Sequence, residues 1–336
     1  MKRFDLLATT ALVALAACSS DDNPTQPGTD QAPSFAVASN TWTLKAPAHI
    51  GVFASSAGAA PNAAGEWFVY KFGGRDGSGG TGWPVEAYNV ATNTWTIKSA
   101  RVGVFNSNGV AKIATRLYFS GGSPEVATPA TYTNAVLAYD YTNDQMIELA
   151  RLPIVSGEGV SGAIDGKLYV LPGVCSGEAY PNPGYCAEDR TRRFYQYDPA
   201  SDTWVARAAS PHFHKRGAAG VLRDKLYVAA GFSNFTKVAN LDVYDPATNS
   251  WKTLAPVPTG GRARGAVLGG RFYVITEGGT YAYNPATNSW ATRASPSEGH
   301  DDVVTVRLNG AARLMAVGGS HGSESDVPND SEMYTP

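Results

Sequence analysis

The chain has 336 residues, enough for one large domain or two of average size. Its formal net charge is −2, with 27 basic and 29 acidic side chains, so it lacks the basic excess typical of proteins that bind nucleic acids. Glycine (36 residues) and proline (21) are abundant and only 17% of residues are charged, which favours many short strands joined by turns over helices.

The first residues have the pattern of an export signal. A basic segment at residues 1–3 precedes an apolar run at residues 6–17. This run is too short to span a bilayer, which takes about 20 residues, but it suits the core of a signal peptide. It ends in Leu15-Ala16-Ala17-Cys18, which resembles the lipobox of bacterial lipoproteins. The resemblance implies cleavage before Cys18 and a lipid anchor on that residue. An ordinary signal peptide with a cysteine nearby by chance is the alternative.

The segment that follows has the composition of a tether. Residues 18–38 are rich in serine, proline and aspartate and too poor in apolar side chains to order themselves. We therefore expect a signal peptide at 1–17, a lipidated cysteine and flexible tether at 18–38, and a folded domain at 39–336. Ser19, directly after the lipidated position, is compatible with sorting to the outer membrane of a bacterial cell envelope.

Two further cysteines, Cys175 and Cys186, flank a loop-like segment rich in glycine, proline and tyrosine. An exported protein reaches a compartment that permits disulfides, so we predict that these two cysteines pair. Free thiols or metal ligands are the alternatives. No Cys-x-x-Cys motif and no adjacent histidine supports a metal.

One segment of the folded domain returns several times. Tyr-Asp-Pro-Ala-Thr-Asn-Ser-Trp at 244–251 becomes Tyr-Asn-Pro-Ala-Thr-Asn-Ser-Trp at 283–290, and looser copies stand at 197–204 and 88–95. A more divergent copy at 139–146 ends in methionine instead of tryptophan. Each copy predicts a strand, a tight turn and a second strand, because proline fixes φ at the turn entry and the later Asn or Asp tolerates the left-handed region. Such a repeat predicts an array of equivalent units.

Each unit can be divided into four short strands, named a to d. In one unit we expect them at 265–268, 271–276, 280–283 and 290–293. Paired glycines follow most b strands, and they allow positive φ and close backbone approach near a crowded centre. The other b strands are expected at residues 67–70, 117–120, 167–170, 225–228 and 313–316.

A hydrophobic strand, Gly-Gly, a tyrosine and then a tryptophan resemble the kelch repeat, and the resemblance covers residues 39–336. It implies an all-β fold, a β-propeller with four antiparallel strands in each blade. Six b strands predict six blades. Residues 39–44 supply a lone strand d and residues 332–336 a lone strand c, so we expect these strands to pair and close the ring. The tryptophans are expected to pack between neighbouring blades.

Strands within a blade alternate in direction, so the tight a–b and c–d turns share one face. The longer b–c and d–a connections share the other, which we call the loop face. Binding residues concentrate on long loops held by rigid elements, so we expect a site there for a polar ligand such as a sugar. The alternative is that these polar residues lie in loops, where polar residues are common, without forming a ligand site. The predicted ligand-binding residues are Arg75, Trp83, Arg101, His212, His214, Arg216, Arg262, Arg264, His300 and His321.

Weaker candidates lie on the same face. His49, His300, His321 and Asp301 have the right types for a metal site, but their spacing is not a recognised signature, so no metal or other cofactor is expected. Glu158, Glu277 and His214 are weak candidates for acid–base catalysis.

Two enzyme families with kelch propellers offer comparisons. Copper-radical oxidases of the galactose oxidase type need a tyrosine–cysteine crosslink, which the predicted cysteine pairing disfavours. The six-bladed N-acetylneuraminate epimerase (a sialic acid mutarotase) agrees in blade number and compartment, although no family motif matches residue by residue.

These observations predict a non-catalytic, lipid-anchored propeller that binds a glycan or a protein through the loop face and does not bind nucleic acid. No Ser-His-Asp, P-loop or Gly-rich cofactor motif is evident. A sugar-converting enzyme resembling the epimerase is the alternative, and a purely structural envelope protein is the second. The step from fold to function is by analogy.

Overall fold

The computed structural model describes residues 39–104, 106–124, 132–174, 192–233, 235–319 and 329–336. The chain divides into Met1–Val37 and Ala38–Pro336, and the described residues all belong to the second unit. The predicted signal peptide and tether, the Cys175–Cys186 pair and His321 lie outside these ranges. Within them, no helix is long and apolar enough to cross a membrane.

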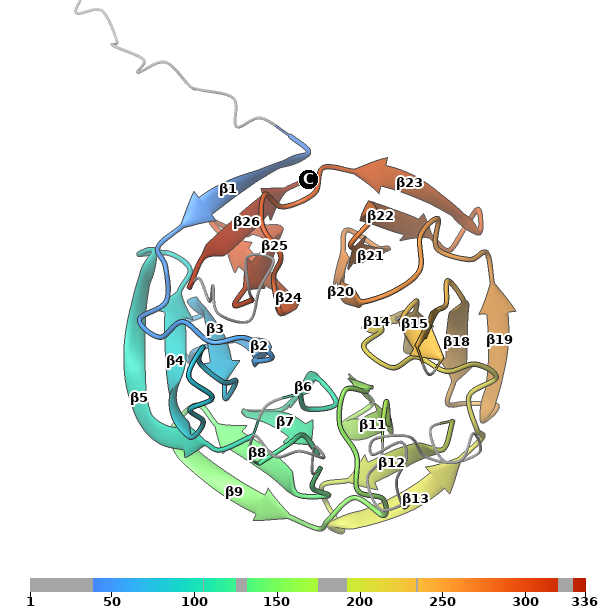
Figure 1. Ribbon diagram of the computed structural model, residues 1–336, viewed down its shortest axis with the longest axis horizontal. Coiled ribbons are helices and arrows are strands. Elements are labelled where there is room, and N and C mark those ends of the chain that lie inside the picture. Colours follow the sequence, from blue (N-terminus) through green and yellow to red (C-terminus); the bar gives the residue numbers. More distant parts are fainter. Residues whose placement is uncertain (1–38, 105, 125–131, 175–191, 234, 320–328) are drawn as a thin grey trace, which may run out of the picture. The chain divides into compact units, whose positions relative to one another are not determined.

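Six four-stranded antiparallel sheets form six blades around a ring, with strand a innermost and strand d outermost (Figure 1). This confirms the predicted all-β, six-bladed propeller. Blade 1 contains β2 (Ser56–Pro61), β3 (Trp67–Phe72), β4 (Trp83–Asn89) and β5 (Thr94–Val102), and blade 2 contains β6 (Val110–Ile113), β7 (Arg116–Ser120), β8 (Val136–Asp140) and β9 (Gln145–Leu149). Blade 3 contains β10 (Val160–Ile164), β11 (Lys167–Leu171), β12 (Phe194–Asp198) and β13 (Thr203–Arg207), and blade 4 contains β14 (Ala218–Leu222), β15 (Lys225–Ala229), β18 (Leu241–Asp245) and β19 (Ser250–Leu254). Blade 5 contains β20 (Ala263–Leu268), β21 (Arg271–Thr276), β22 (Gly279–Asn284) and β23 (Ser289–Arg293), and blade 6 contains β24 (Asp302–Leu308), β25 (Ala311–Val317), β26 (Ser331–Thr335) and β1 (Thr41–Lys45).

Blade 6 is built from strands far apart in the sequence. Strand β1 pairs antiparallel with β26 over five positions, from Thr41 opposite Thr335 to Lys45 opposite Ser331. The predicted closure, in which an N-terminal strand d completes the last blade, is therefore confirmed. Closure leaves no blade with a missing outer strand, and so removes a free sheet edge.

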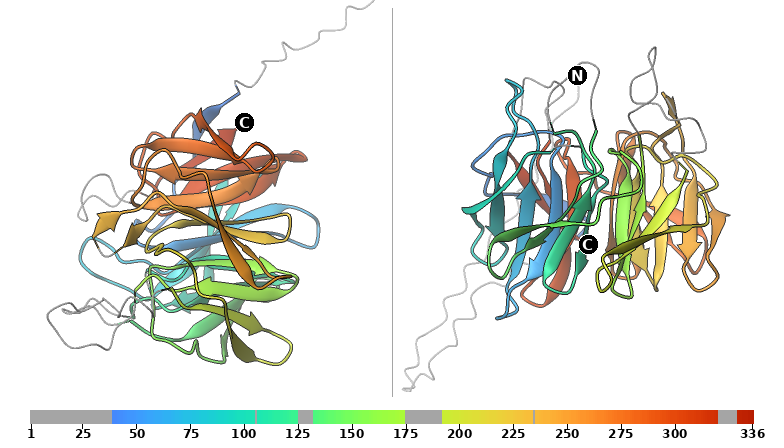
Figure 2. Two further views of the ribbon diagram at one scale, coloured as in Figure 1. Left: turned by 90° about the vertical axis from the view of Figure 1, so that its right-hand side faces the viewer. Right: turned by 90° about the horizontal axis from the view of Figure 1, so that it is seen from below.

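The two faces of the ring differ as expected from the turns. Asp165 and Gly166 have φ values of 48° and 66°, and Arg223 and Asp224 have 53° and 57°, the conformation of two-residue type I′ hairpins. These a–b turns leave little room for a site. On the loop face, the β3–β4 connection and a short hairpin of β16 (Phe232–Ser233) and β17 (Thr236–Lys237) project from the same side of the ring (Figure 2).

The hydrophobic core is divided among the contacts between neighbouring blades. One cluster joins Val160 and Tyr169 of blade 3 to Leu226 and Tyr244 of blade 4. Gly162 in β10 makes this close packing possible, because a Cβ at that position would lie only 2.6 Å from a methyl carbon of Leu226. Small residues in strand a thus let the next blade approach.

The repeated Tyr–Asx–Trp pattern ties each blade to the one before it. In blade 5 the Asn288 carboxamide oxygen accepts hydrogen bonds from the Tyr283 hydroxyl at 2.7 Å and from the backbone N–H of Ala255 in blade 4 at 3.0 Å. The Trp290 indole N–H donates to the carbonyl of the same Ala255 at 2.9 Å. Equivalent indole bonds start from Trp42, Trp95, Trp204 and Trp251, so the tryptophans do bridge neighbouring blades as predicted.

Blade 2 shows how the pattern survives the loss of its tryptophan. Asp144 accepts from the Tyr139 hydroxyl at 2.8 Å, as in the other blades. It also accepts from the backbone N–H and the hydroxyl of Ser99 in blade 1, at 2.8 and 2.6 Å. A carboxylate with an extra serine partner therefore holds the blade 1–blade 2 contact where Met146 can donate no hydrogen bond.

We expect Asn288→Ala to lower the free energy of unfolding by about 2 kcal/mol, because two hydrogen bonds are lost and alanine is disfavoured at a φ of 49°. Urea unfolding followed by tryptophan fluorescence measures the change. Asn288→Asp is the matched control and should be nearly neutral, since Asp144 and Asp202 occupy the equivalent position in blades 2 and 3. Equal losses in both variants would contradict the bridging role.

Candidate functional site at the channel mouth

A ring of main-chain hydrogen bonds surrounds the loop-face end of the central channel. Four d–a connections end at a residue with positive φ: Ala54, Asn106, Glu158 and Arg216, at 55–58°. Three of the four donate a backbone N–H to the carbonyl of the equivalent residue one blade back: Asn106 to Ala54 at 2.9 Å, Glu158 to Asn106 at 2.8 Å and Arg216 to Glu158 at 2.7 Å. The N–H of Ala263 continues the ring to Arg216 at 2.9 Å. Non-glycine residues held in this conformation cost on the order of 1–3 kcal/mol each and gather at functional sites.

Side chains complete the ring through blade 6. The Arg264 guanidinium donates from Nε to the carbonyl of Asp301. The Asp301 carboxylate accepts from the backbone N–H and the hydroxyl of Ser55, at 2.9 and 3.0 Å, which returns the ring to blade 1. The neighbouring carboxylate of Asp302 accepts from the N–H of Ala57 at 2.8 Å. All six blades are thereby tied together at the mouth.

The ring encloses a cavity of about 310 Å³ that continues into the channel, which we call the mouth cavity. Small and hydroxyl-bearing residues of the inner strands form much of its wall. Its charged lining comes from blades 2 to 6 and includes four basic and three acidic side chains: Lys112, Arg216, Arg262, Arg264, Glu158, Asp301 and Asp302.

The charge of Glu158 is already compensated within the protein. Its carboxylate is 4% exposed and lies 2.5 Å from Nη2 of Arg216 and 3.1 Å from Nζ of Lys215. Burial by itself would raise the pKa of Glu158, but the two cations outweigh it and hold the pKa below its usual value. Glu158 is therefore an ionised residue that orients Arg216.

Arg262 is the arginine with the most spare hydrogen-bonding capacity at the mouth. Its buried Nε has no hydrogen-bond partner among the described residues. The guanidinium is 36% exposed, and its Nη2 lies 3.7 Å from the Asp301 carboxylate, beyond hydrogen-bonding distance. A guanidinium in this state presents donors to an incoming carboxylate.

Two half-buried groups at the mouth have displaced pKa values. Burial, followed by the neighbouring Arg262 charge, lowers the pKa of Arg264 to about 9. Burial raises the pKa of Asp302 to about 6, even though the Ala57 N–H and Arg264 favour its ionised form. Asp302 therefore changes charge in a range close to neutral pH.

The structure brings together three of the ten predicted ligand-binding residues, Arg216, Arg262 and Arg264, and adds the weak catalytic candidate Glu158 and the weak metal candidate Asp301.

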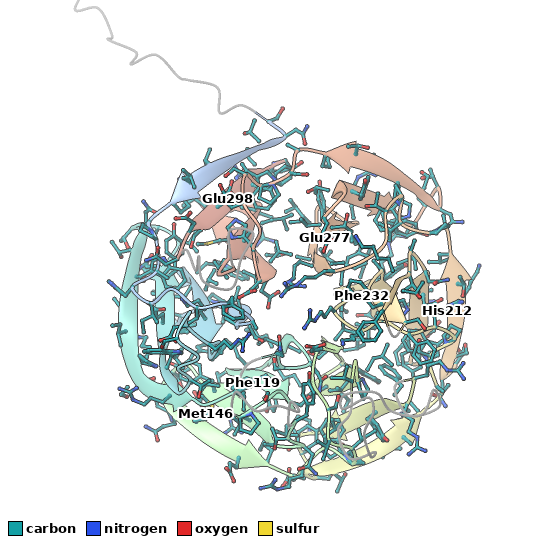
Figure 3. All side chains as sticks on the ribbon, viewed as in Figure 1. Phe119, Met146, His212, Phe232, Glu277 and Glu298 are labelled. Atoms are coloured by element: carbon teal, nitrogen blue, oxygen red, sulfur yellow. The ribbon has the colours of Figure 1, made fainter. Side chains whose placement is uncertain are left out.

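The predicted histidines are engaged in packing. His214 is 1% exposed, with Nδ1 2.8 Å from the Ala230 carbonyl and Nε2 2.9 Å from the Asp242 carboxylate. His212 contacts the same carboxylate at 2.8 Å and lies toward the outside of blade 4 (Figure 3). His300 is 3.0 Å from the Glu332 carboxylate.

Other predicted residues border the loop face away from the mouth cavity. The Arg75 guanidinium lies 4.5 Å from the ring centre of Phe53. Trp83 donates to the carbonyl of Gly80 at 3.0 Å, and Arg101 donates to that of Gly82 at 3.1 Å. The weak catalytic candidate Glu277 is 55% exposed and paired with Lys237 at 2.6 Å.

For the weak metal hypothesis, the structure offers no assembled ligand set in the ranges it covers. No group of three His, Cys, Asp or Glu side chains there could hold a metal ion. His49 is committed to the carbonyl of Trp95, 3.1 Å from its Nε2, and His300 to Glu332. His321, the third histidine of that hypothesis, lies outside the described residues.

Sequence reasoning missed the hydroxyl-bearing part of the mouth. Ser55 and Ser56 of blade 1, Ser107 of blade 2, Ser161 of blade 3 and Thr305 of blade 6 all line the cavity. The sequence does hold a signal for the four serines, which all stand within three residues of the start of strand a, whereas Thr305 lies in the middle of β24. Short hydroxyl residues are too common in loops and strands for that position alone to indicate a site.

Comparisons with known proteins agree with the propeller fold. The model of the Kelch motif matches residues 215–258, which cover β14, β15, β18 and β19 of blade 4. Blade 4 of this chain therefore carries a kelch motif. The chain is 30% identical over 191 residues to Kelch-like protein terF of Aspergillus terreus, a match over 54% of this chain and 40% of that protein. It is 25% identical over 230 residues to Kelch-like protein 38 of Homo sapiens, over 67% of this chain and 35% of that protein.

The kelch repeats of this chain thus span roughly a third of the curated relatives that they match. Among solved structures, the one titled "Structure of YjhT" superposes with a TM-score of 0.68 at 17% identity, over 86% of this chain and 96% of that one. At this identity the likeness concerns the fold alone. Kelch propellers typically mediate protein binding, which fits a ring whose longer connections share one face.

Proposed function

We propose that this protein is a lipid-anchored, non-catalytic binding module of the bacterial cell envelope. It takes a glycan or protein partner on its loop face, and an anionic group of the partner enters the mouth cavity. The observation that carries this proposal is Arg262, a partly exposed guanidinium whose buried Nε has no partner in the described part of the chain. The exposed part of this guanidinium is free to donate to a bound carboxylate, and a hydrogen bond to a charged group is worth about 1.5–3 kcal/mol.

The surroundings of Arg262 support the same ligand chemistry. Arg216 and Arg264 face the same cavity, and Glu158 holds Arg216 in place. A cavity of about 310 Å³ has the size of a small-ligand pocket. The anchor on Cys18 and the envelope location rest on the sequence at the N-terminus.

A thermal-shift screen tests the proposal. The acidic sugars N-acetylneuraminate and galacturonate are compared with neutral galactose and with an acidic peptide. A ligand present at 100 times its Kd stabilises the folded protein by about 2.7 kcal/mol, so we expect the melting temperature to rise with an anionic ligand and not with galactose. No rise with any anionic ligand would contradict the proposal.

The displaced pKa of Asp302 predicts how such binding depends on pH. Below about pH 6 the Asp302 carboxyl is protonated, which removes a negative charge from the mouth. We expect the affinity for a carboxylate that stays ionised to increase on the order of tenfold from pH 7.5 to pH 5. Titration calorimetry at both pH values measures it. The Asp302→Asn variant should bind the carboxylate tightly at both pH values. A pH dependence equal to that of the wild-type protein would contradict the assignment of this effect to Asp302.

A sugar-converting enzyme is the second candidate, and Asp302 is the specific observation in its favour. A carboxyl with a pKa of about 6 beside Arg264 is suited to exchange a proton with a bound sugar. The structure favours it for this role over Glu158, which is ionised and paired, and over His214, which is buried. Exchange NMR of an acidic sugar would show faster anomeric interconversion with the protein and loss of that effect in Asp302→Asn. A pure binding module predicts no acceleration.

A further inference from the structure

Blade 5 lacks the long b–c connection that its neighbours have. Only Glu277 and Gly278 separate β21 from β22, whereas the equivalent connections of the other five blades contain 10 to 22 residues. A cavity of about 580 Å³, which we call the side cavity, lies at this short connection between blades 5 and 6. Glu277 borders it on the blade 5 side and Glu298 on the blade 6 side (Figure 3).

The side cavity adjoins the mouth cavity. Arg262, Arg264 and residues 301–303 line both of them. A ligand whose carboxylate is held by Arg262 therefore has the side cavity directly next to it. A ligand larger than one sugar unit would extend outward over blade 5, where the connection is shortest.

The wall of the side cavity combines apolar surface with hydrogen-bonding groups. Ile275, Pro296, Val303 and Ala316 supply the apolar part, and Thr276, Ser295 and Glu277 supply hydroxyl and carboxylate groups. Such a mixture suits a sugar ring, which has apolar faces and hydroxyl edges. Because Glu277 is already paired with Lys237 at 2.6 Å, its carboxylate is better placed to accept from a hydroxyl than to attract a cation.

The strands that border this cavity give little support to a peptide. Strands β21, β22 and β25 are each paired on both sides within their sheets, so they offer no free edge to which an extended peptide could add. The other two strands that border the cavity, β20 and β24, are the innermost strands of their blades, and their free edges face the channel (Figure 1). Away from Arg262 and Arg264, which the cavity shares with the mouth, the charged groups of the wall are carboxylates such as Glu277 and Glu298, and these would repel an acidic peptide.

We propose that the side cavity is a second sugar subsite and that the ligand is an acidic oligosaccharide. Its acidic residue lies in the mouth cavity and the adjoining residue lies in the side cavity. This inference rests on the proposed function, since it needs the anionic group to be held at Arg262.

Titration calorimetry with galacturonic acid and with galacturonosyl-rhamnose, a disaccharide whose second ring is neutral, tests the inference on the whole protein. We expect the disaccharide to bind at least about tenfold more tightly, because the second ring buries surface without a second loss of translational freedom. Two variants close the side cavity: Glu277→Trp, and a six-residue Gly/Ser insertion between Glu277 and Gly278. In both, the advantage of the disaccharide should disappear while galacturonic acid binds as before.

Glu148→Trp, the same change at an exposed position of β9, is the matched control and should keep the advantage. Equal affinity for the two sugars in the wild-type protein would overturn the inference while leaving the proposed function intact. An advantage that survives in both blocked variants would overturn it as well. If neither sugar binds, both the inference and the proposal of an anionic sugar at the mouth fail. If only an acidic peptide binds, the inference fails.

Discussion

Replacing Arg262 with glutamine is expected to weaken binding of an acidic sugar about 10- to 100-fold, since a charge-assisted hydrogen bond is worth about 1.5–3 kcal/mol. The stability of the free protein should change little. The Arg262 guanidinium makes no hydrogen bond that the structure shows, and its distance of 3.7 Å from Asp301 leaves only a weak attraction to lose. Calorimetry measures the affinity, and urea unfolding measures the stability.

Arg101→Gln is the matched control for this change. Arg101 is an exposed arginine on the same face, outside the mouth cavity, so its replacement should leave the affinity within about twofold. Arg216 and Arg264 are poorer choices, because Arg216 compensates buried Glu158 and Arg264 ties blade 5 to Asp301. Equal losses for Arg262→Gln and Arg101→Gln would indicate general electrostatic attraction and not a site at the mouth.

The second large effect concerns closure of the ring. Replacing residues 41–45 with Gly-Ser-Gly-Ser-Gly in the full chain removes five paired positions with β26 and the bond from the Trp42 indole to the carbonyl of Ala294. It also removes the packing of Trp42 on Tyr334, whose ring centres are 5.2 Å apart. We expect a loss of about 4 kcal/mol or more, because removal of a packed tryptophan alone costs about 3–5 kcal/mol.

The matched control for closure lies in the same strand. The Leu44 side chain is 67% exposed, so Leu44→Ser should change the unfolding free energy by less than about 0.5 kcal/mol. Urea unfolding and the rate of trypsin cleavage report both variants. If the replaced strand leaves both measurements unchanged, then β1 does not hold the ring closed in solution.

The fold was predictable because each repeat contains the residues that make its main contacts. The tyrosine, the Asn or Asp five residues later and the tryptophan after it form one bridge between two blades, as at Tyr283, Asn288 and Trp290. The three side chains of each bridge are close in the sequence, so the repeat indicates both the strands and the side chains that join one blade to the next. The lone strands at the two ends then determined the number of blades.

The site was only partly predictable. Arg216 and Glu158 stand at equivalent positions of neighbouring blades, and the sequence does indicate that such positions enter strand a. Whether a loop residue faces the channel or the packing depends on partners from other strands. His214 stands only two residues before Arg216, yet Asp242 in β18 draws it into the interior of blade 4. The side cavity depends on the length of a connection, which the sequence shows, and on its position beside Arg262, which only the structure shows.

An anionic ligand that occupies the mouth should shield Arg262 from chemical modification. Phenylglyoxal, which modifies accessible arginines, can be applied to the protein with and without a saturating acidic sugar, and the modified residues identified by mass spectrometry. We predict that the ligand protects Arg262 while exposed Arg101 reacts at an unchanged rate. Modification of Arg262 at the same rate in both samples, or protection confined to arginines away from the mouth, would contradict the account.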